Sequence, residues 1–268
     1  RLLYFICFPA LLFVELAKAD FAGQPVLRFG GPLLATQLLM AGLAAALRRP
    51  LAMPGPSYTS VVQCVVRWNS YVALATAPVL FGPGASPLAA IAVAIMVPVA
   101  NLVSVAALAR HGKGRAPGIL PTLKALASNP LVVACVAGIL LNASGLGLPT
   151  LLAEPLAMLG KATLALGLLV VGAALQPGAM LARPAWTAVA TVGKLLAKPL
   201  AALGIGLAAG LDATALGVAV LVCAVPTSTT SYILARLLGG DVELMTSLVT
   251  TTTILAIVTM PLVLALVS

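Results

Sequence analysis

The stretch Arg67-Trp68-Asn69-Ser70-Tyr71 interrupts a long apolar run of this chain, and Pro226-Thr227-Ser228-Thr229-Thr230-Ser231-Tyr232 interrupts a later one. Polar and helix-breaking residues at these places predict that the backbone unwinds there. Inside a membrane, an unwound backbone is tolerated only where protein or a water-filled cavity satisfies its N–H and C=O groups. A pair of interrupted helices in the two halves of a chain is typical of transporters built from inverted repeats. Both stretches are therefore the first candidates for a substrate site.

The composition places the chain in a membrane. Of its 268 residues, 62% are hydrophobic and 8% are charged, whereas about 25% of the residues of a soluble globular protein are charged. Because about 20 apolar residues in a helix cross the hydrocarbon core of a bilayer, the apolar runs predict nine membrane segments. The segments are 1–19, 27–48, 58–82, 87–110, 129–146, 149–175, 184–210, 212–239 and 242–267.

The net charge of +9 does not indicate nucleic-acid binding, because the basic residues are concentrated on one side of the predicted topology. If the nine segments cross alternately, only Lys18 and Arg28 lie on the side that is poorer in basic residues. The positive-inside rule makes the richer side cytosolic, which puts the C-terminus outside. The basic residues of the cytosolic side are Arg1, Arg48, Arg49, Arg110, Lys113, Arg115, Lys124, Arg183 and Arg236.

The inventory of reactive side chains argues against an enzyme. The only histidine, His111, lies in a basic loop, so no metal site, cofactor or catalytic triad is expected within the membrane. The chain has no Gly-rich phosphate loop with its lysine, so a gradient rather than ATP is expected to drive it. The cysteines show no C-x-x-C spacing and are expected to be small buried hydrophobic residues. They are Cys7, Cys64, Cys135 and Cys223.

The two interrupted segments also indicate an internal repeat. Asn69-Ser70-Tyr71 in the first and Thr230-Ser231-Tyr232 in the second lead into similar apolar runs. The second half of the chain has five predicted segments and the first half has four, so the sequence predicts a further helix before Arg1 that is absent from this chain. The paired segments, 58–82 and 212–239, are the third and the eighth, and this odd separation of five positions gives the two halves opposite orientations. We divide the chain into a first repeat (1–110), a cytosolic loop (111–128) and a second repeat (129–268).

Six short stretches are distinctive through their order and spacing rather than singly. They extend from the first predicted segment to the loop before the last one. They are Phe8-Pro9-Ala10-Leu11-Leu12-Phe13, Arg67-Trp68-Asn69-Ser70-Tyr71, Pro98-Val99-Ala100-Asn101-Leu102-Val103-Ser104-Val105, Asn129-Pro130-Leu131, Lys194-Leu195-Leu196-Ala197-Lys198-Pro199-Leu200, and Ala224-Val225-Pro226-Thr227 through Gly239-Gly240-Asp241.

Together these stretches resemble the bacterial auxin efflux carrier family of secondary transporters over essentially the whole chain. The resemblance implies an all-α polytopic membrane protein with two inverted five-helix repeats, similar to sodium/proton antiporters and bile-acid symporters. The discontinuous helices, 58–82 and 212–239 here, would cross at their breaks. It also implies a multi-pass protein of the bacterial inner membrane that carries small organic anions such as auxin or dicarboxylates.

The distribution of charge points independently to an anion. A basic residue at the centre of a bilayer costs about 2.5–3.5 kcal/mol on insertion scales, so it needs a compensating role. Few acidic residues are predicted at the same depth, so the core of the protein is electropositive. The N-terminal ends of the half-helices add to this positive potential. The basic residues predicted near the middle of the bilayer are Arg67, Lys161, Lys194 and Lys198.

The predicted substrate site combines these cations with polar groups beside the breaks. Arg67, Lys194 and Lys198 would supply positive potential, while side chains and freed backbone amides at the breaks would supply hydrogen bonds. The predicted substrate-binding residues are Arg67, Asn69, Ser70, Tyr71, Lys194, Lys198, Pro226, Thr227, Ser228 and Thr229.

Each basic residue has a structural alternative. Lys194 or Lys198 could bind a carbonyl oxygen of an unwound segment, in place of the sodium ion that related folds hold there. Lys161 could pair with Glu154, two helical turns earlier. Arg67 could extend to the cytosolic surface.

The small polar residues have an alternative role as well. Hydrogen bonds between helices are the alternative role of Asn69, Asn101, Thr227, Ser228, Thr229 and Thr230. The run Thr250-Thr251-Thr252-Thr253 is expected to bond to the backbone of its own helix.

The sequence therefore predicts a secondary active transporter that moves a small organic anion or carboxylate by alternating access. The runner-up is a cation/proton antiporter of related fold, which needs a carboxylate at the crossing; the sequence places none there. A third alternative is a channel or a membrane sensor that does not transport. The expected partners are an organic anion, the lipid bilayer and a coupling ion, either a proton or sodium; nucleic acid is not expected, and a homodimer stays open.

Overall fold

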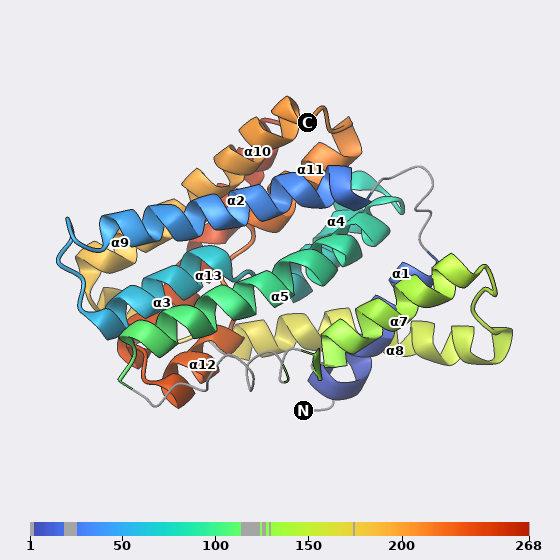
Figure 1. Cartoon of the computed structure of the whole chain (residues 1–268), viewed down its shortest axis with the longest axis horizontal. Helices are drawn as coiled ribbons and strands as arrows, with labels where there is room; N and C mark the ends of the chain where they lie inside the picture. The colour runs from blue at the N-terminus through green and yellow to red at the C-terminus, as the bar shows by residue number, and fades with distance from the viewer. Residues whose placement is uncertain are drawn as a thin grey trace.

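The computed structural model describes residues 3–18, 26–113, 124, 127–128, 130–173 and 175–267. Within these ranges the chain is helical and contains no strand (Figure 1). The elements are η1 (Leu3–Cys7), α1 (Phe8–Ala17), α2 (Val26–Leu47), α3 (Gly55–Val66), α4 (Ser70–Phe81), α5 (Ala85–His111), α7 (Pro130–Ser144), α8 (Thr150–Ala173), η2 (Pro177–Leu181), α9 (Pro184–Val192), η3 (Gly193–Ala197), α10 (Lys198–Ala208), α11 (Ala213–Ala224), α12 (Thr230–Leu238) and α13 (Val242–Leu264).

Each of the nine predicted segments contains one helix or a run of consecutive helices, so the prediction of an all-α polytopic membrane protein is confirmed. Among the described residues, six helical stretches are long and apolar enough to cross a membrane, and three apolar helices are shorter. Large apolar side chains such as Leu27, Val79 and Ile257 are 87%, 81% and 74% exposed. A soluble protein seldom exposes so many side chains of this kind, whereas in a membrane protein they face lipid.

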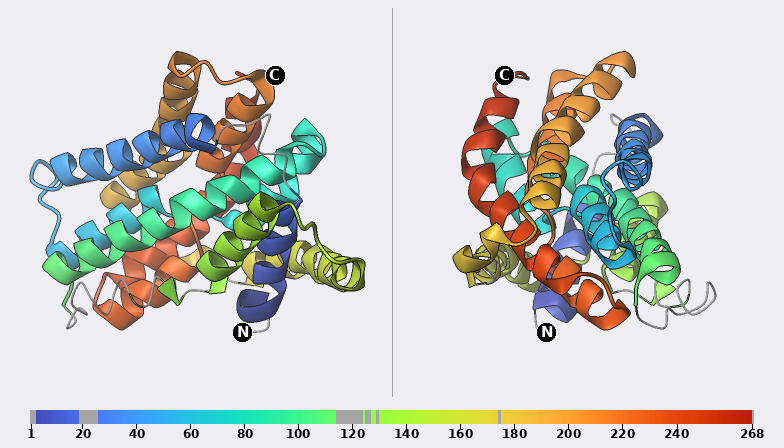
Figure 2. Two further views of the ribbon diagram at one scale, coloured as in Figure 1. Left: turned by 45° about the vertical axis from the view of Figure 1, so that its right-hand side comes forward. Right: turned by 90° about the vertical axis from the view of Figure 1, so that its left-hand side faces the viewer.

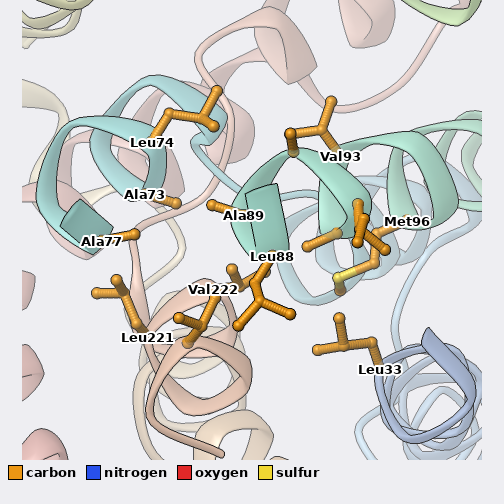
Figure 3. Packing of buried hydrophobic residues seen from close by; sticks show 14 of the residues in the cluster. Leu33, Ala73, Leu74, Ala77, Leu88, Ala89, Val93, Met96, Leu221 and Val222 are labelled. Atoms are coloured by element: carbon orange, nitrogen blue, oxygen red, sulfur yellow. The ribbon is translucent and has the colours of Figure 1, made fainter. Parts of the chain in front are cut away.

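Small apolar residues lie where three helices meet in the interior. Ala73 and Ala77 of α4 and Ala89 of α5 are fully buried, and Figure 3 shows them at the contact between α4, α5 and α11. Small side chains let helix backbones approach closely, which is the main source of helix association where lipid removes the hydrophobic driving force. The core thus fixes α4 and α5 against α11, which leads into the second break.

Three helices form a group beside the rest of the bundle. Figure 1 and the left view of Figure 2 show α1, α7 and α8 lying together. Gly138 of α7 faces the backbone of Phe13, and Gly160 of α8 faces Leu11, so both helices approach α1 closely. We call these helices the α1–α7–α8 group and the others, α2–α5 and α9–α13, the crossing bundle.

Both interrupted segments unwind, as predicted. The helix α3 ends at Val66, Arg67 is extended (φ −83°, ψ 153°), and α4 begins after Asn69, whose Oδ1 accepts a hydrogen bond from the N–H of Val72 at 3.3 Å. Asparagine is among the preferred residues at a helix N-cap, so this break forms without a proline. At the second break Val225 is extended (φ −58°, ψ 152°), because a following proline disfavours the helical conformation.

The two breaks meet inside the protein. The N–H of Asn69 donates to the carbonyl oxygen of Pro226 at 2.9 Å, and the Thr227 hydroxyl donates to the carbonyl oxygen of Arg67 at 3.5 Å. We call this contact, between 67–69 and 225–229, the crossing. The division into inverted five-helix repeats at 1–110, 111–128 and 129–268 stays a prediction, and the further helix expected before Arg1 lies outside the described residues.

Candidate functional site

A cavity of about 710 Å³ lies beside the crossing. Its polar end is formed by residues 67–71 of the first break and 228–230 of the second. The other walls are mainly aromatic and aliphatic: Phe5 and Phe8 come from the start of the α1–α7–α8 group, and Leu237 comes from the last turn of α12. The cavity therefore lies between this group and the crossing bundle, with its polar groups gathered at the breaks.

Arg67 is held at the polar end of the cavity. Its guanidinium donates hydrogen bonds to Asn101 Oδ1 of α5 and to Thr230 Oγ1, the first residue of α12, at 2.7 Å. These bonds join helices from the two halves of the chain and place the positive charge at the crossing. Asn101 and Thr230 were not among the predicted substrate-binding residues, although a lone asparagine within an apolar helix is a sequence signal for function.

The next two residues carry buried hydrogen-bond donors. Trp68 and Asn69 are only 3% and 2% exposed, both line the cavity, and Trp68 Nε1 and Asn69 Nδ2 have no hydrogen-bond partner in the described part of the chain. Leaving a buried donor unpartnered costs about 1–3 kcal/mol. Both residues follow Arg67 directly, so an acceptor-rich group that reached this end of the cavity would relieve that cost.

Tyr71 connects the crossing to the α1–α7–α8 group. Its ring lies 4.7 Å from that of Phe8. A Cβ atom placed on Gly167 of α8 would lie 2.7 Å from Tyr71 Cδ1, closer than packed atoms allow. Only glycine fits at this position without a shift, so α8 and α4 are in close contact beside the cavity.

Residues of the second break divide between the cavity and the helix packing. Ser228 and Thr229 line the cavity, and Ser228 Oγ lies 2.8 Å from Thr230 Oγ1. Thr227 is fully buried, and its N–H donates to Thr252 Oγ1 of α13 at 3.3 Å. Thr227 thus holds the break against α13 instead of facing the cavity.

Lys194 and Lys198 are fully buried at the ends of the half-helices. Lys194 Nζ donates to the carbonyl oxygen of Cys223 at 3.0 Å, near the end of α11. Lys198 Nζ donates to the carbonyl oxygens of Val65 at 2.8 Å and Val66 at 3.2 Å, at the end of α3. These contacts support the alternative in which the lysines bind carbonyls of the interrupted helices.

Among the ten predicted residues, the structure brings six to the cavity and leaves four outside its lining. Direct contact of the two lysines with a substrate stays a prediction, and the described geometry offers no route for it. The six are Arg67, Asn69, Ser70, Tyr71, Ser228 and Thr229; the four are Lys194, Lys198, Pro226 and Thr227.

The described residues test two smaller predictions and leave a third untested. The four cysteines are free and buried, which confirms that prediction. The threonine run bonds to its own helix at Thr252 and Thr253, whereas Thr250 Oγ1 accepts from the N–H of Gln176. The proposed pairing of Lys161 with Glu154 depends on a lysine side chain outside the described residues.

These observations define a polytopic membrane protein in which two interrupted helices meet beside a cavity with a cationic, donor-rich end. A family model described as membrane transport protein matches residues 118–264, more than half of the chain. The chain belongs to this family, the auxin efflux carrier family, which confirms the resemblance found in the sequence motifs. No curated protein matches the chain.

Proposed function

We propose that this membrane transport protein is a secondary active transporter that moves a small organic anion bearing a carboxylate through the cavity. One observation carries the proposal: the Arg67 guanidinium and the unpartnered donors of Trp68 and Asn69 lie on three consecutive residues that line one cavity. A carboxylate only accepts hydrogen bonds, at about four lone-pair sites. It is therefore the kind of group that complements these donors.

The helix ends add to the attraction for an anion. α4 begins at Ser70 and α12 begins at Thr230, both beside the cavity. The first N–H groups of a helix lack intrahelical partners, and its N-terminus carries about half a positive charge. The site is thus positive from several directions.

The same lining argues against the cation/proton antiporter. Such a carrier needs an acidic side chain to bind and release its ion. Among the described residues that line the cavity there is no aspartate or glutamate. An anion carrier needs none, so this observation favours the first function over the second.

The location of the cavity supports alternating access. Its walls come from both the α1–α7–α8 group and the crossing bundle, and it extends from the breaks to Phe5, Leu131 and Leu237. In the predicted orientation these three residues lie toward the cytosolic ends of their helices. The cavity would then open to the cytosol, and movement of one group against the other would expose the crossing to the outside. The bacterial inner membrane is the proposed location.

Uptake by purified protein in liposomes tests this function. We expect saturable uptake of at least one radiolabelled anion from a panel of aliphatic and aromatic mono- and dicarboxylates, with competition among them. Uptake that never saturates would indicate a channel. Uptake of ²²Na⁺ or proton-driven cation exchange, with no carboxylate flux from the panel, would indicate the antiporter instead.

A further inference from the structure

We propose that Lys194 and Lys198 are fixed cations at the place where a coupling alkali cation would bind, so that the protein binds no Na⁺ at its crossing. The proposed function leaves the coupling ion open. The inference rests on that function only where it treats Na⁺ as a coupling ion, because binding of Na⁺ at the crossing can be measured without any transport. The contacts that carry it belong to the crossing itself and involve no substrate.

The ends of the two half-helices create a need for positive charge. The last carbonyls of a helix lack intrahelical partners, and its C-terminus carries about half a negative charge. α3 ends at Val66 and α11 ends at Ala224, and both ends are buried in the interior. In transporters with discontinuous helices, such carbonyls and helix ends are the groups that coordinate Na⁺. The crossing thus has the donor set of a cation site.

Lysine ammonium groups bind these carbonyls in the present structure. Lys198 Nζ bonds to the Val65 and Val66 oxygens, and Lys194 Nζ bonds to the Cys223 oxygen. The Val66 oxygen also accepts a bond from Gln37 Nε2 at 3.4 Å. The carbonyls that an alkali cation would use at each half-helix end therefore already have cationic donors from the protein.

One irregular helix supplies both cations. Between α9 and α10 the backbone forms the π-helical turn η3, in which the N–H of Lys198 bonds to the carbonyl oxygen of Gly193. Such turns insert one residue into a helix and occur often at functional sites. Here the turn separates two lysines that reach the ends of two different half-helices, α11 and α3. A single element thus compensates both breaks.

The local charge disfavours binding of a further cation. Two lysine amines one turn apart face two helix ends of about half a negative charge each, so a single protonated amine already balances those ends. The described acids lie elsewhere: Asp212 and Asp241 cap the starts of α11 and α13, and Glu15, Glu154 and Glu243 belong to α1, α8 and the first turn of α13. A Na⁺ ion would meet unscreened repulsion in this interior. Removing the lysines reverses the balance and leaves bare carbonyls.

Thermal unfolding of the purified protein tests the inference without any organic anion. NaCl is titrated against N-methyl-D-glucamine chloride at constant ionic strength, for the parent, Lys194→Ala/Lys198→Ala, Lys198→Arg and the exposed control Lys113→Ala. We expect no saturable Na⁺-dependent rise in the melting temperature of the parent, Lys198→Arg or the control. The double variant should gain one, since a ligand that binds only the folded state stabilises it in proportion to ln(1 + [L]/Kd).

Two outcomes would overturn the inference: a saturable Na⁺ effect on the parent, or a folded double variant that ignores Na⁺. A double variant that can be purified only in Na⁺ would support it. If that variant does not fold in any salt, binding of ²²Na⁺ to the parent decides, and saturable binding contradicts the inference. Because these readouts contain no carboxylate, a failed anion-uptake assay would refute the proposed function alone.

Discussion

The backbone N–H of Asn69 donates a hydrogen bond to the carbonyl oxygen of Pro226 at 2.9 Å. The bond joins two breaks that lie in different halves of the chain, and each break supplies the other with a partner for a freed backbone group. The protein itself thus satisfies freed backbone groups of both breaks. The same arrangement leaves the Asn69 side chain at the edge of the cavity.

Asn69→Asp should separate the capping role of this residue from its role in binding. Aspartate caps a helix as well as asparagine does, so the melting temperature should stay close to that of the parent. The substitution replaces the Nδ2 donor with a carboxylate oxygen that repels an anion, so apparent affinity for the transported carboxylate should fall at least about tenfold, from loss of one hydrogen bond to a charged group.

Asn69→Ser is the matched control for that change, since serine also caps helices but adds no charge. It should fall between the parent and Asn69→Asp in uptake assays. Equal affinities for all three proteins would show that Nδ2 does not meet the substrate.

Lys198→Met should lower stability and leave apparent affinity for the anion nearly unchanged. The substitution removes the donor for the Val65 carbonyl and one of the two donors for the Val66 carbonyl, and a buried acceptor left unpaired costs about 1–3 kcal/mol. The side chain does not line the cavity. Melting temperatures and uptake of Lys198→Met should be compared with those of Lys113→Met; a strong loss of affinity at parent-like stability would restore this lysine to the substrate site.

Gly167→Ala should slow transport, because the new Cβ would meet the Tyr71 ring at 2.7 Å. In the same helix, a Cβ atom added to Gly172 would have no neighbouring atom within 4 Å, so Gly172→Ala is the control. Alanine favours a helix over glycine by about 0.8–1.0 kcal/mol, which should make the control neutral or slightly stabilised. Equal transport rates for the two variants would show that α8 and α4 need not stay in close contact.

The orientation in the membrane can be checked by labelling single introduced cysteines with an impermeant maleimide. Lys113→Cys should react only from the cytosolic side and Leu146→Cys, at an exposed position after α7, only from outside. The native cysteines are buried and provide a low background. The reverse pattern would contradict the positive-inside assignment and the cytosolic opening of the cavity.

The sequence predicted what depends on local composition. Apolar length located the long helical stretches of the described part of the chain, and Pro226 and Asn69 marked the breaks because their effects on the backbone act on neighbouring residues. It did not show which polar residues face the cavity: the Thr227 hydroxyl donates to the Arg67 carbonyl oxygen, and Thr230 accepts from the Arg67 guanidinium. Nor could it decide between two roles for Lys194 and Lys198, because their partners lie far away in the sequence and only tertiary packing brings them together.

Arg67 provides the most direct test of an anion carrier. Uptake of the preferred carboxylate into liposomes should be measured for the parent, Arg67→Lys, Arg67→Gln and the exposed control Arg236→Gln. Loss of a hydrogen bond to a charged group costs about 1.5–3 kcal/mol, so Arg67→Gln should weaken apparent affinity about 10- to 100-fold, with Arg67→Lys intermediate and the control unchanged. If Arg67→Gln folds like the parent and transports the carboxylate with unchanged affinity, the cavity beside the crossing is not the anion site.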